Sequence, residues 1–265
     1  MGNVDKSDLI LVLRTNNERT IDICKELAAA QVGEDKIVVI NEKPFFKAVI
    51  KTFEIGIKSQ SKYLIALDAD ILLFSDAIEY MMEEANNMDS DWFRMDFPIY
   101  DKFRGRVTGV HFYNNKYSER FYDYLLANDK TNAIRPEYNS LREFCEMRNL
   151  IYNYIPHYIV GKHDYFQYYN DIYRKYTVRE RRSHLEKNTE ILYERLRKFN
   201  ESYIDDYDYF FALRAFEDSM KGCIREGNVS EEFGIKEKMP IGKKEEIFIK
   251  KNCLKNRIMN KYVRK

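Results

Sequence analysis

The sequence predicts an α/β fold in which one largely parallel sheet carries helices on both faces. Three segments in the first part of the chain are almost continuously apolar, and patterns typical of amphipathic helices separate them. Strands of a parallel sheet are covered on both faces, so they form unbroken apolar runs rather than alternating ones. Strands that alternate with helices favour this layered arrangement. Beyond about residue 180 the sequence becomes charged helix, which predicts a helical C-terminal extension.

The elements of the first half alternate strictly between strand and helix. In order, they are a strand over residues 8–15, a helix over 17–31, a strand over 36–42, a helix over 45–59, a strand over 62–70 and a helix from Ser75 to about Ala85. Ile21, Cys24 and Leu27 fall on one face of the first helix, as an amphipathic pattern requires. Pro44 ends the second strand, because proline cannot donate a hydrogen bond to a sheet.

The second half is less regular. Its expected elements are a strand over 106–115, helices over 117–128 and 137–150, a short strand over 155–161, an aromatic helical segment over 163–176, and charged helices over 179–199 and 205–222. The chain contains neither a repeat nor a Gly/Ser linker. We therefore divide it into a sheet domain over residues 1–180 and a charged helical extension over residues 181–265.

Composition excludes several classes of protein. The chain is 45% hydrophobic and 15% aromatic, enough for a sizeable core, and its 44 basic and 43 acidic residues nearly balance, which argues against a general nucleic-acid binder. Cys24, Cys145, Cys223 and Cys253 are far apart, so we expect the reduced thiols of a cytoplasmic protein. The short apolar run near the N-terminus predicts neither a signal peptide nor a spanning helix, and Lys6 stands where myristoylation needs Ser or Thr.

The last segment, residues 242–265, is strongly basic, with nine basic and two acidic residues. One interpretation is a solvated terminus. The other is a segment that rests on an anionic membrane surface or on a partner. The second interpretation places the protein peripherally at the inner face of a membrane.

A pair of carboxylates ends the third strand. Asp68 and Asp70 follow the apolar run KYLIAL, with only Ala69 between them. Alternate residues of an extended chain point the same way, so we expect both carboxylates on one side, at the strand end where α/β sheets bind ligands. Adjacent carboxylates repel unless a cation lies between them, and their oxygens suit Mg²⁺ or Mn²⁺. The alternative is structural: Asp70 caps the next segment and Asp68 pairs with a nearby Lys or Arg.

A D-x-D motif after strand–helix–strand–helix resembles the GT-A fold of nucleotide-sugar-dependent glycosyltransferases. The resemblance covers about residues 8–176 and implies a metal site at Asp68 and Asp70 that holds the donor. Asp70 is expected to bind the ion directly, whereas Asp68 contacts the donor ribose or sugar, or the metal through water. It also implies donor-binding residues at the strand ends, within the motif and on the helix before it: Arg14, Thr15, Asn41, Glu42, Lys47, Lys51 and Ala69. The segment TGVHFYNN is similar to the strand that follows the motif in family-8-like enzymes, which implies that Gly109 and His111 lie near the donor sugar.

The resemblance further implies a late histidine as the third metal ligand. His163 follows a predicted strand, and an imidazole with two carboxylates is a sound ligand set for Mn²⁺. Arg174 and Lys175 come next, where a basic residue of the retaining enzymes binds the leaving diphosphate. The alternative for His163 is a residue at a helix start, with Asp164 as the cap.

Two departures limit the resemblance. The H-x-x-G-x-x-K-P-W pattern of family-8-like enzymes is replaced by H-D-Y-F-Q-Y-Y, and no E-D pair near a helix start offers the base of family-2 enzymes. The catalytic base and the choice between retention and inversion therefore stay open. A group of aromatic residues after His163 fits either a sugar-stacking surface or, as we expect, packed core. They are Tyr165, Phe166, Tyr168, Tyr169, Tyr173 and Tyr176.

Two other functions use the same residues. A phosphatase of the haloacid-dehalogenase type also ends a strand in D-x-D, with Asp68 then the nucleophile and Asp70 the acid/base. Against it, Leu72 stands where that motif usually has Thr or Val, and the motif lies on the third strand rather than the first. A non-catalytic protein that kept a nucleotide-sugar-binding fold is the third possibility, because fold alone does not establish activity.

We therefore expect a metal-dependent glycosyltransferase of the hexosyltransferase type, with residues 1–180 as its catalytic domain. The donor is expected to be a UDP- or GDP-sugar held by Mn²⁺ or Mg²⁺. The acceptor is expected to be a hydroxyl of a glycan or lipid-linked molecule, such as a bacterial surface-glycan precursor. The expected setting is cytoplasmic, with peripheral membrane contact through the basic C-terminus and no nucleic-acid partner. The sequence leaves the sugar, the acceptor and the oligomeric state open.

Overall fold

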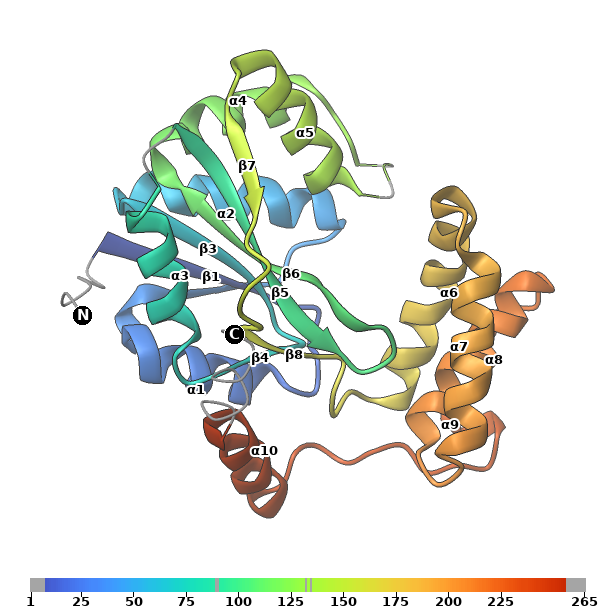
Figure 1. Ribbon diagram of the computed structural model, residues 1–265. Helices are drawn as coiled ribbons and strands as arrows, with labels where there is room; N and C mark the ends of the chain where they lie inside the picture. Colours follow the sequence, from blue (N-terminus) through green and yellow to red (C-terminus); the bar gives the residue numbers. More distant parts are fainter. Residues whose placement is uncertain (1–7, 89–90, 132, 134, 256–265) are drawn as a thin grey trace.

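One mixed sheet of eight strands forms the centre of the molecule, with helices on both faces and a lobe of helices at one side (Figure 1). The computed structural model describes residues 8–88, 91–131, 133 and 135–255. The strands are β1 (Leu9–Arg14), β2 (Ile37–Ile40), β3 (Tyr63–Asp68), β4 (Ile71–Leu73), β5 (Trp92–Asp101), β6 (Gly105–Asn114), β7 (Ile151–Tyr154) and β8 (Gly161–His163). Their order is β2-β1-β3-β6-β5-β8-β4, and β7 pairs with β5. The predicted α/β class is confirmed.

Helices fill the connections between these strands and continue beyond the last of them. They are α1 (Ile21–Val32), α2 (Phe45–Ser59), α3 (Ala77–Asn86), α4 (Ser118–Ala127), α5 (Pro136–Arg148), α6 (Tyr169–Glu186), α7 (Thr189–Ser202), α8 (Tyr207–Met220), α9 (Val229–Glu232) and α10 (Lys243–Lys255), with short 3₁₀ helices η2 (Glu34–Lys36) and η3 (Asn115–Tyr117). Among the residues described, no helix is both long enough and apolar enough to cross a bilayer.

The sheet is less parallel than the sequence indicates. β1 pairs in parallel with β2 and β3, as the apolar runs predict. However, β6 runs antiparallel to both β3 and β5, and β4 runs antiparallel to β8. The sequence pattern does not predict β5, because its buried residues include Arg94, Asp96 and Asp101.

The side chains of β3 alternate between two cores. Ile65 and Leu67 pack on the face covered by α1 and α3, whereas Leu64 and Ala66 pack on the face covered by α2, α4 and α5. Both cores are built mainly from aliphatic and aromatic side chains, so the central strands lose contact with water on both sides. Only the strand ends remain available for polar chemistry.

The segment that enters α6 also differs from expectation. The strand expected over 155–161 lies instead at Gly161–His163, and α6 begins at Tyr169 rather than at residue 163. Asp164 and Phe166 have φ angles of 63° and 65°, a left-handed conformation that continues neither a strand nor a helix. The predicted domain boundary at residue 180 lies inside α6 and stays a prediction.

The helices α6 to α9 form a lobe with its own core beside the sheet (Figure 1). Tyr173 and Tyr176 of α6 are 2% exposed in this core, so the interpretation of these two aromatic residues as core is confirmed. Phe103, from the hairpin between β5 and β6, inserts into the same core with its ring centroid 4.8 Å from that of Tyr176. The hairpin therefore joins the lobe to the sheet.

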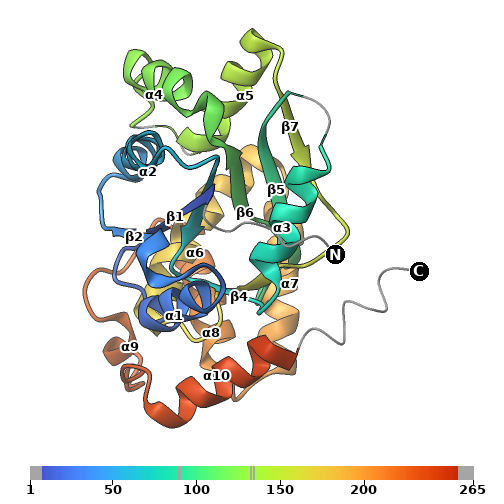
Figure 2. The ribbon, with the colours of Figure 1, turned by 90° about the vertical axis from the view of Figure 1, so that its left-hand side faces the viewer.

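The C-terminal helix α10 docks beside α1 (Figure 2). Ile249 and Cys253 are each 1% exposed, and Glu245 forms an ion pair with Arg19 at 2.7 Å. The solvated-terminus interpretation is therefore wrong for this helix, because one of its faces is part of the core. The basic residues within 256–265 lie outside the described residues, so membrane contact stays a prediction.

Candidate active site

The carboxyl ends of β1 and β3 bring an arginine and a carboxylate together. Parallel pairing sets Arg14 opposite Asp68, and Arg14 Nε donates to Asp68 Oδ1 at 2.8 Å. Arg14 Nη1 donates to Glu137 Oε2 of α5 at 2.9 Å. Burial opposes the charge on Arg14, but Asp68 and Glu137 outweigh it and hold its pKa above the ordinary value. Asp68 is thus the ion-pair partner of an arginine, which is the structural alternative for this residue.

The two carboxylates of the D-x-D motif do not share one cation. The chain leaves β3 after Asp68 and turns at Ala69 and Asp70, with Ala69 N donating to Arg14 O at 2.9 Å. Alternation of side chains holds only for an extended chain, so the turn gives Asp70 other partners. Asp68 stays outside the group of described residues that could hold a metal, and direct ligation by Asp68 is not supported.

Asp70 belongs instead to a cluster with His163 and Asp164, which we call the acidic cluster. Each offers one ligand atom, and these atoms lie within 4.8 Å of one another. His163 ends β8, and β4 and β8 pair so that Ile71 lies opposite His163, which brings Asp70 to the same edge. The left-handed φ of Asp164 is rare for a non-glycine residue and turns its carboxylate into the cluster.

Lys175 of α6 supplies the cation of the acidic cluster in this structure. Its Nζ lies 2.6 Å from Asp70 Oδ2 and 3.1 Å from His163 Nε2, and it also forms an ion pair with Asp164. Burial raises the pKa of the Asp70 carboxyl, but Lys175 and His163 outweigh burial and hold that pKa well below its usual range. The ammonium group thus lies among all three potential metal ligands.

A buried carboxylate fixes the orientation of His163. Asp101 Oδ2 lies 2.8 Å from His163 Nδ1, and Asp101 Oδ1 accepts the backbone N–H groups of Phe103 and Arg104 at 2.9 and 2.8 Å. Because a carboxylate only accepts, Nδ1 carries the proton and Nε2 faces the acidic cluster. Metal-binding histidines typically have such a carboxylate partner on the other ring nitrogen.

The acidic cluster fits a divalent cation. Asp70 Oδ1 is buried and accepts no hydrogen bond from any residue in the described part of the chain. A buried oxygen without a partner is costly, and a cation would take its free lone pairs. Two carboxylates and one imidazole suit Mn²⁺ especially, because this ion accepts both oxygen and nitrogen ligands.

The residues predicted to receive the nucleotide lie at the ends of β1 and β2. Thr15 and Asn41 come to one edge, since Thr15 N donates to Ile40 O at 2.8 Å. Thr15 Oγ1 donates to Glu18 Oε2 at 2.7 Å, and Asn41 donates to Asn17 at 2.9 Å. Burial raises the pKa of Glu18, the hydrogen bonds from Thr15 and Asn16 lower it, and the negative charge of Asp70 raises it further.

The helix α2 begins at the same edge with an exposed aromatic ring. Phe45 is 45% exposed, and the Arg14 guanidinium lies 5.0 Å from its ring centroid. Lys47 is exposed, like Glu42 in the preceding loop, and Lys51 forms an ion pair with Glu54 at 3.0 Å. The donor roles of these three residues stay predictions.

Gly109 and His111 have structural explanations. β6 bulges at Gly109, because Phe97 pairs with Val110 and Pro98 with Thr108, and a Cβ at Gly109 would lie 2.0 Å from Ile99 Cδ1. The missing side chain is thus explained by packing. His111 Nδ1 lies 2.7 Å from Asp96 Oδ1, within a buried network that includes Arg94.

The two residues of the predicted basic pair, Arg174 and Lys175, have different surroundings. Lys175 reaches the acidic cluster, whereas Arg174 is largely exposed and donates to Asp171 at 2.7 Å. Sequence reasoning missed the contributions of Asp101 and Asp164. Asp164 directly follows His163, so its position was a usable signal, but Asp101 lies on the unpredicted strand β5.

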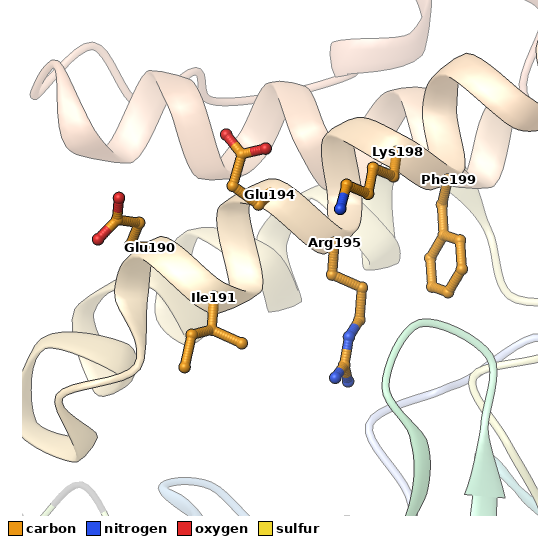
Figure 3. A pocket seen from close by; sticks show the side chains of 6 residues that line it. All are labelled: Glu190, Ile191, Glu194, Arg195, Lys198 and Phe199. Atoms are coloured by element: carbon orange, nitrogen blue, oxygen red, sulfur yellow. The ribbon is translucent and has the colours of Figure 1, made fainter.

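An open groove of about 500 Å³ lies along α7, lined by Glu190, Ile191, Glu194, Arg195, Lys198 and Phe199 (Figure 3). Arg195 extends towards the β5–β6 hairpin, where its Nη1 donates to Arg104 O at 2.9 Å. The groove thus adjoins the hairpin that begins after Asp101, the partner of His163.

The sequence matches no protein-family profile, and no curated protein is significantly similar to it. Among solved structures, it is similar to a glycosyltransferase involved in the glycosylation of the major capsid of PBCV-1 (12% identity, TM-score 0.41, 59% of this chain and 94% of that one). It is also similar to the mannosyltransferase PcManGT from Pyrobaculum calidifontis, in complex with GDP-Man and Mn²⁺ (10%, 0.40, 97% and 88%). A third is a cytidylyltransferase from Leptospira borgpetersenii (8%, 0.39, 56% and 76%). At these values no family is established, and function must be argued from the site.

Proposed function

We propose that this protein is a divalent-metal-dependent glycosyltransferase that uses a UDP- or GDP-sugar and transfers the sugar to a hydroxyl acceptor. The observation that carries the proposal is the acidic cluster, in which Asp70 Oδ1 is buried without a partner among the described residues. The cluster lies at the carboxyl ends of the strands, where α/β sheets bind their ligands.

Asp70, His163 Nε2 and Asp164 are the proposed metal ligands, with Mn²⁺ or Mg²⁺ as the ion. When bound, the ion supplies charge neutralisation of a diphosphate leaving group. Lys175 has its ammonium group at 2.6 Å from Asp70, so it would have to leave the three ligand atoms when they held a metal ion. It would then be free to donate hydrogen bonds to phosphate oxygens of the donor.

Arg14, Asp68 and Phe45 form the proposed nucleoside side of the site. The Asp68 side chain is 40% exposed and is held by Arg14, so its free oxygen can accept a hydrogen bond from a ribose hydroxyl. Burial raises the pKa of Glu137, but Arg14, together with His111, Arg94 and the hydrogen bond from Tyr113, outweighs burial and brings that pKa down to about 2, which keeps the pair charged. The exposed ring of Phe45 offers a stacking surface for the base.

Several parts of this proposal rest on the sequence alone. They are the acceptor, a glycan or lipid-linked hydroxyl, the peripheral membrane contact through the basic C-terminus, and the cytoplasmic setting. The division into a catalytic domain over 1–180 and an extension over 181–265 also belongs here. No residue is proposed as the base, and the stereochemical outcome stays open.

Calorimetry with UDP and GDP, with and without Mn²⁺, tests the proposal. We expect one nucleotide to bind only with Mn²⁺, and Asp70→Asn to weaken that binding at least tenfold. The control is Asp123→Asn, the same change at an exposed position of α4. The proposal fails if neither nucleotide shows metal-dependent binding. If the wild type hydrolyses p-nitrophenyl phosphate and Asp68→Asn abolishes this activity, the result would favour the phosphatase function. Binding of the nucleotide-sugar without hydrolysis or transfer to any acceptor would favour a binding protein.

A further inference from the structure

A group of arginines gathers beside the acidic cluster. We call Arg104, Arg135, Arg179 and Arg182 the arginine cluster. Arg104 comes from the β5–β6 hairpin, Arg135 from the residue before α5, and the other two from α6. Arg179 follows Lys175 by four residues and Arg182 follows Arg179 by three, so the three cations share one face of α6.

Two members of the arginine cluster have counter-ions. Arg104 Nη2 donates to Asp101 Oδ2 at 2.9 Å, and Arg135 forms an ion pair with Glu186 near the end of α6. These contacts fix the two sides of the cluster: one on the hairpin that orients His163, the other where α6 approaches α5.

Arg179 and Arg182 have no counter-ion among the residues that the structure describes. Within the described ranges neither guanidinium forms an ion pair, and Arg182 Nε is buried without a hydrogen-bond partner. Burial lowers the pKa of Arg179, and Arg104 lowers it further. Burial and the repulsion from Arg179 and Arg135 lower the pKa of Arg182 to about 10. Asp101 and Asp164 offset part of this effect at Arg179, and Glu186 offsets part of it at Arg182. Half-buried guanidinium groups that repel one another are suited to binding an anion.

The donor alone does not account for this charge. A divalent cation would balance Asp70 and Asp164, and Arg104 balances Asp101, which leaves Lys175, Arg179 and Arg182 for phosphate groups. Along an α-helix each residue rises about 1.5 Å, so Arg182 lies roughly 10 Å from Lys175 along the axis. Lys175 contacts the acidic cluster, whereas Arg182 lies about two helical turns further along α6, where it is available for a second anion.

We propose that Arg182, together with Arg135, Arg179 and Arg104, binds a phosphate group of the acceptor, so that the acceptor class is a phosphate-bearing molecule. The identification of this molecule as the acceptor rests on the proposed function, whereas the proposal of an anion site does not depend on that function. Guanidinium groups suit this role because their paired N–H groups match phosphate oxygens. The α7 groove continues beyond Arg104 and offers room for the rest of such a molecule.

The first test is calorimetry with inorganic pyrophosphate in the presence of EDTA, which removes any metal. The wild type is expected to bind, and the double variant Arg179→Gln/Arg182→Gln is expected to bind at least tenfold more weakly. The matched control is Arg181→Gln, the same change at an exposed position of the same helix. The variant Arg179→Lys/Arg182→Lys keeps the charge and is expected to retain part of the affinity. Equal binding by wild type and double Gln variant overturns the inference, as does an equal loss in Arg181→Gln.

A competition experiment separates the second site from the donor site. Pyrophosphate is expected to bind the wild type after saturation with Mn²⁺ and the preferred nucleotide, and the exposed control Asp123→Asn is expected to leave pyrophosphate binding in EDTA within about twofold of wild type. If the nucleotide excludes pyrophosphate, the arginine cluster belongs to the donor and the inference is overturned while the proposed function stands. If no nucleotide binds but pyrophosphate binding still depends on Arg179 and Arg182, the proposed function fails and the anion site stands.

A sedimentation experiment distinguishes soluble from lipid-borne phosphate. Vesicles of phosphatidylcholine with phosphatidic acid are compared with vesicles of phosphatidylcholine alone. If the wild type binds the vesicles with phosphatidic acid and the double Gln variant does not, the acceptor is lipid-linked. Pyrophosphate binding without vesicle binding supports a soluble acceptor with the same phosphate chemistry.

Discussion

Replacing Asp101 with asparagine should weaken the binding of Mn²⁺. Asp101 is fully buried, and its carboxylate accepts from His163 Nδ1, from two backbone N–H groups and from Arg104. An asparagine oxygen can still accept the two backbone groups, but its NH₂ group then faces the two side-chain donors. His163 loses the group that holds its Nε2 towards the acidic cluster. Losing such a partner typically costs about 10- to 100-fold in metal affinity, or about 1.4 to 2.7 kcal/mol.

The matched control is Asp96→Asn, on the same strand. Asp96 is also a buried aspartate between a histidine and an arginine, with His111 Nδ1 at 2.7 Å and Arg94 Nη2 at 2.7 Å. Both variants lose charged hydrogen bonds, so both should be destabilised by a few kcal/mol, on the order of 1.5 to 3 for each such bond.

The assay is Mn²⁺ titration by calorimetry or by electron paramagnetic resonance of free Mn²⁺, with circular dichroism as the check on folding. Only Asp101→Asn should lose metal affinity. If Asp101→Asn binds Mn²⁺ like the wild type, or if Asp96→Asn loses as much, His163 is not a metal ligand positioned by Asp101.

Three further variants test other parts of the site. Lys175→Met removes the ammonium group that competes for the acidic cluster, so Mn²⁺ should bind more tightly while sugar transfer falls about tenfold or more; a loss of Mn²⁺ affinity would contradict this. Glu137→Gln should cost about 3 kcal/mol near neutral pH by leaving the buried Arg14 partly uncompensated. Because the pKa of Glu137 is lowered to about 2 in the folded state, its stabilisation is present above its ordinary pKa and is lost as the pH falls towards 2. Urea unfolding at pH 6 and pH 3 should therefore show a smaller difference between Glu137→Gln and wild type at pH 3, and a constant difference would refute the charge pairing. Phe45→Ala should weaken nucleotide binding about tenfold through lost stacking, with Mn²⁺ affinity unchanged. The exposed Phe248→Ala on α10 is its control, and equal losses in both would rule out a specific contact.

The central strands could be predicted from the sequence because each of them is a continuous apolar run, which indicates burial on both faces. Residues 8–15 and 62–70 are apolar on both faces, and the pairing of β1 with β3 requires nothing beyond that pattern. β5 could not be predicted in this way. Its buried Arg94 is stabilised by Asp96 and by Tyr113 of β6, and a pattern within one segment cannot show that such a charge will find distant partners.

The sequence could predict where the candidate site lies, but not all of the residues that form it. The ends of predicted strands led to Asp70 and His163, and the structure brings these two residues together. Lys175 was expected there only from the resemblance, and the structure brings it to the same cluster, while the roles of all three stay predictions. The placement of Asp68 failed, because spacing by two residues implies a shared face only while the chain stays extended, and the chain turns at Ala69. The contribution of Asp101 could not be predicted, because Asp101 lies on β5 and the sequence pattern does not predict this strand.

The β5–β6 hairpin limits how this protein could be re-engineered. Phe103 is fully buried in the core of the helical lobe, and Lys102 forms ion pairs with Asp206 and Asp208 at the start of α8. The backbone N–H of Lys102 donates to His163 O at 3.0 Å, and Asp101 beside it holds the His163 imidazole. Exchanging the lobe for another one would therefore loosen His163, the proposed metal ligand, unless the new lobe kept a pocket for the Phe103 ring. On the proposed function, the acceptor site and the metal site would have to be redesigned together.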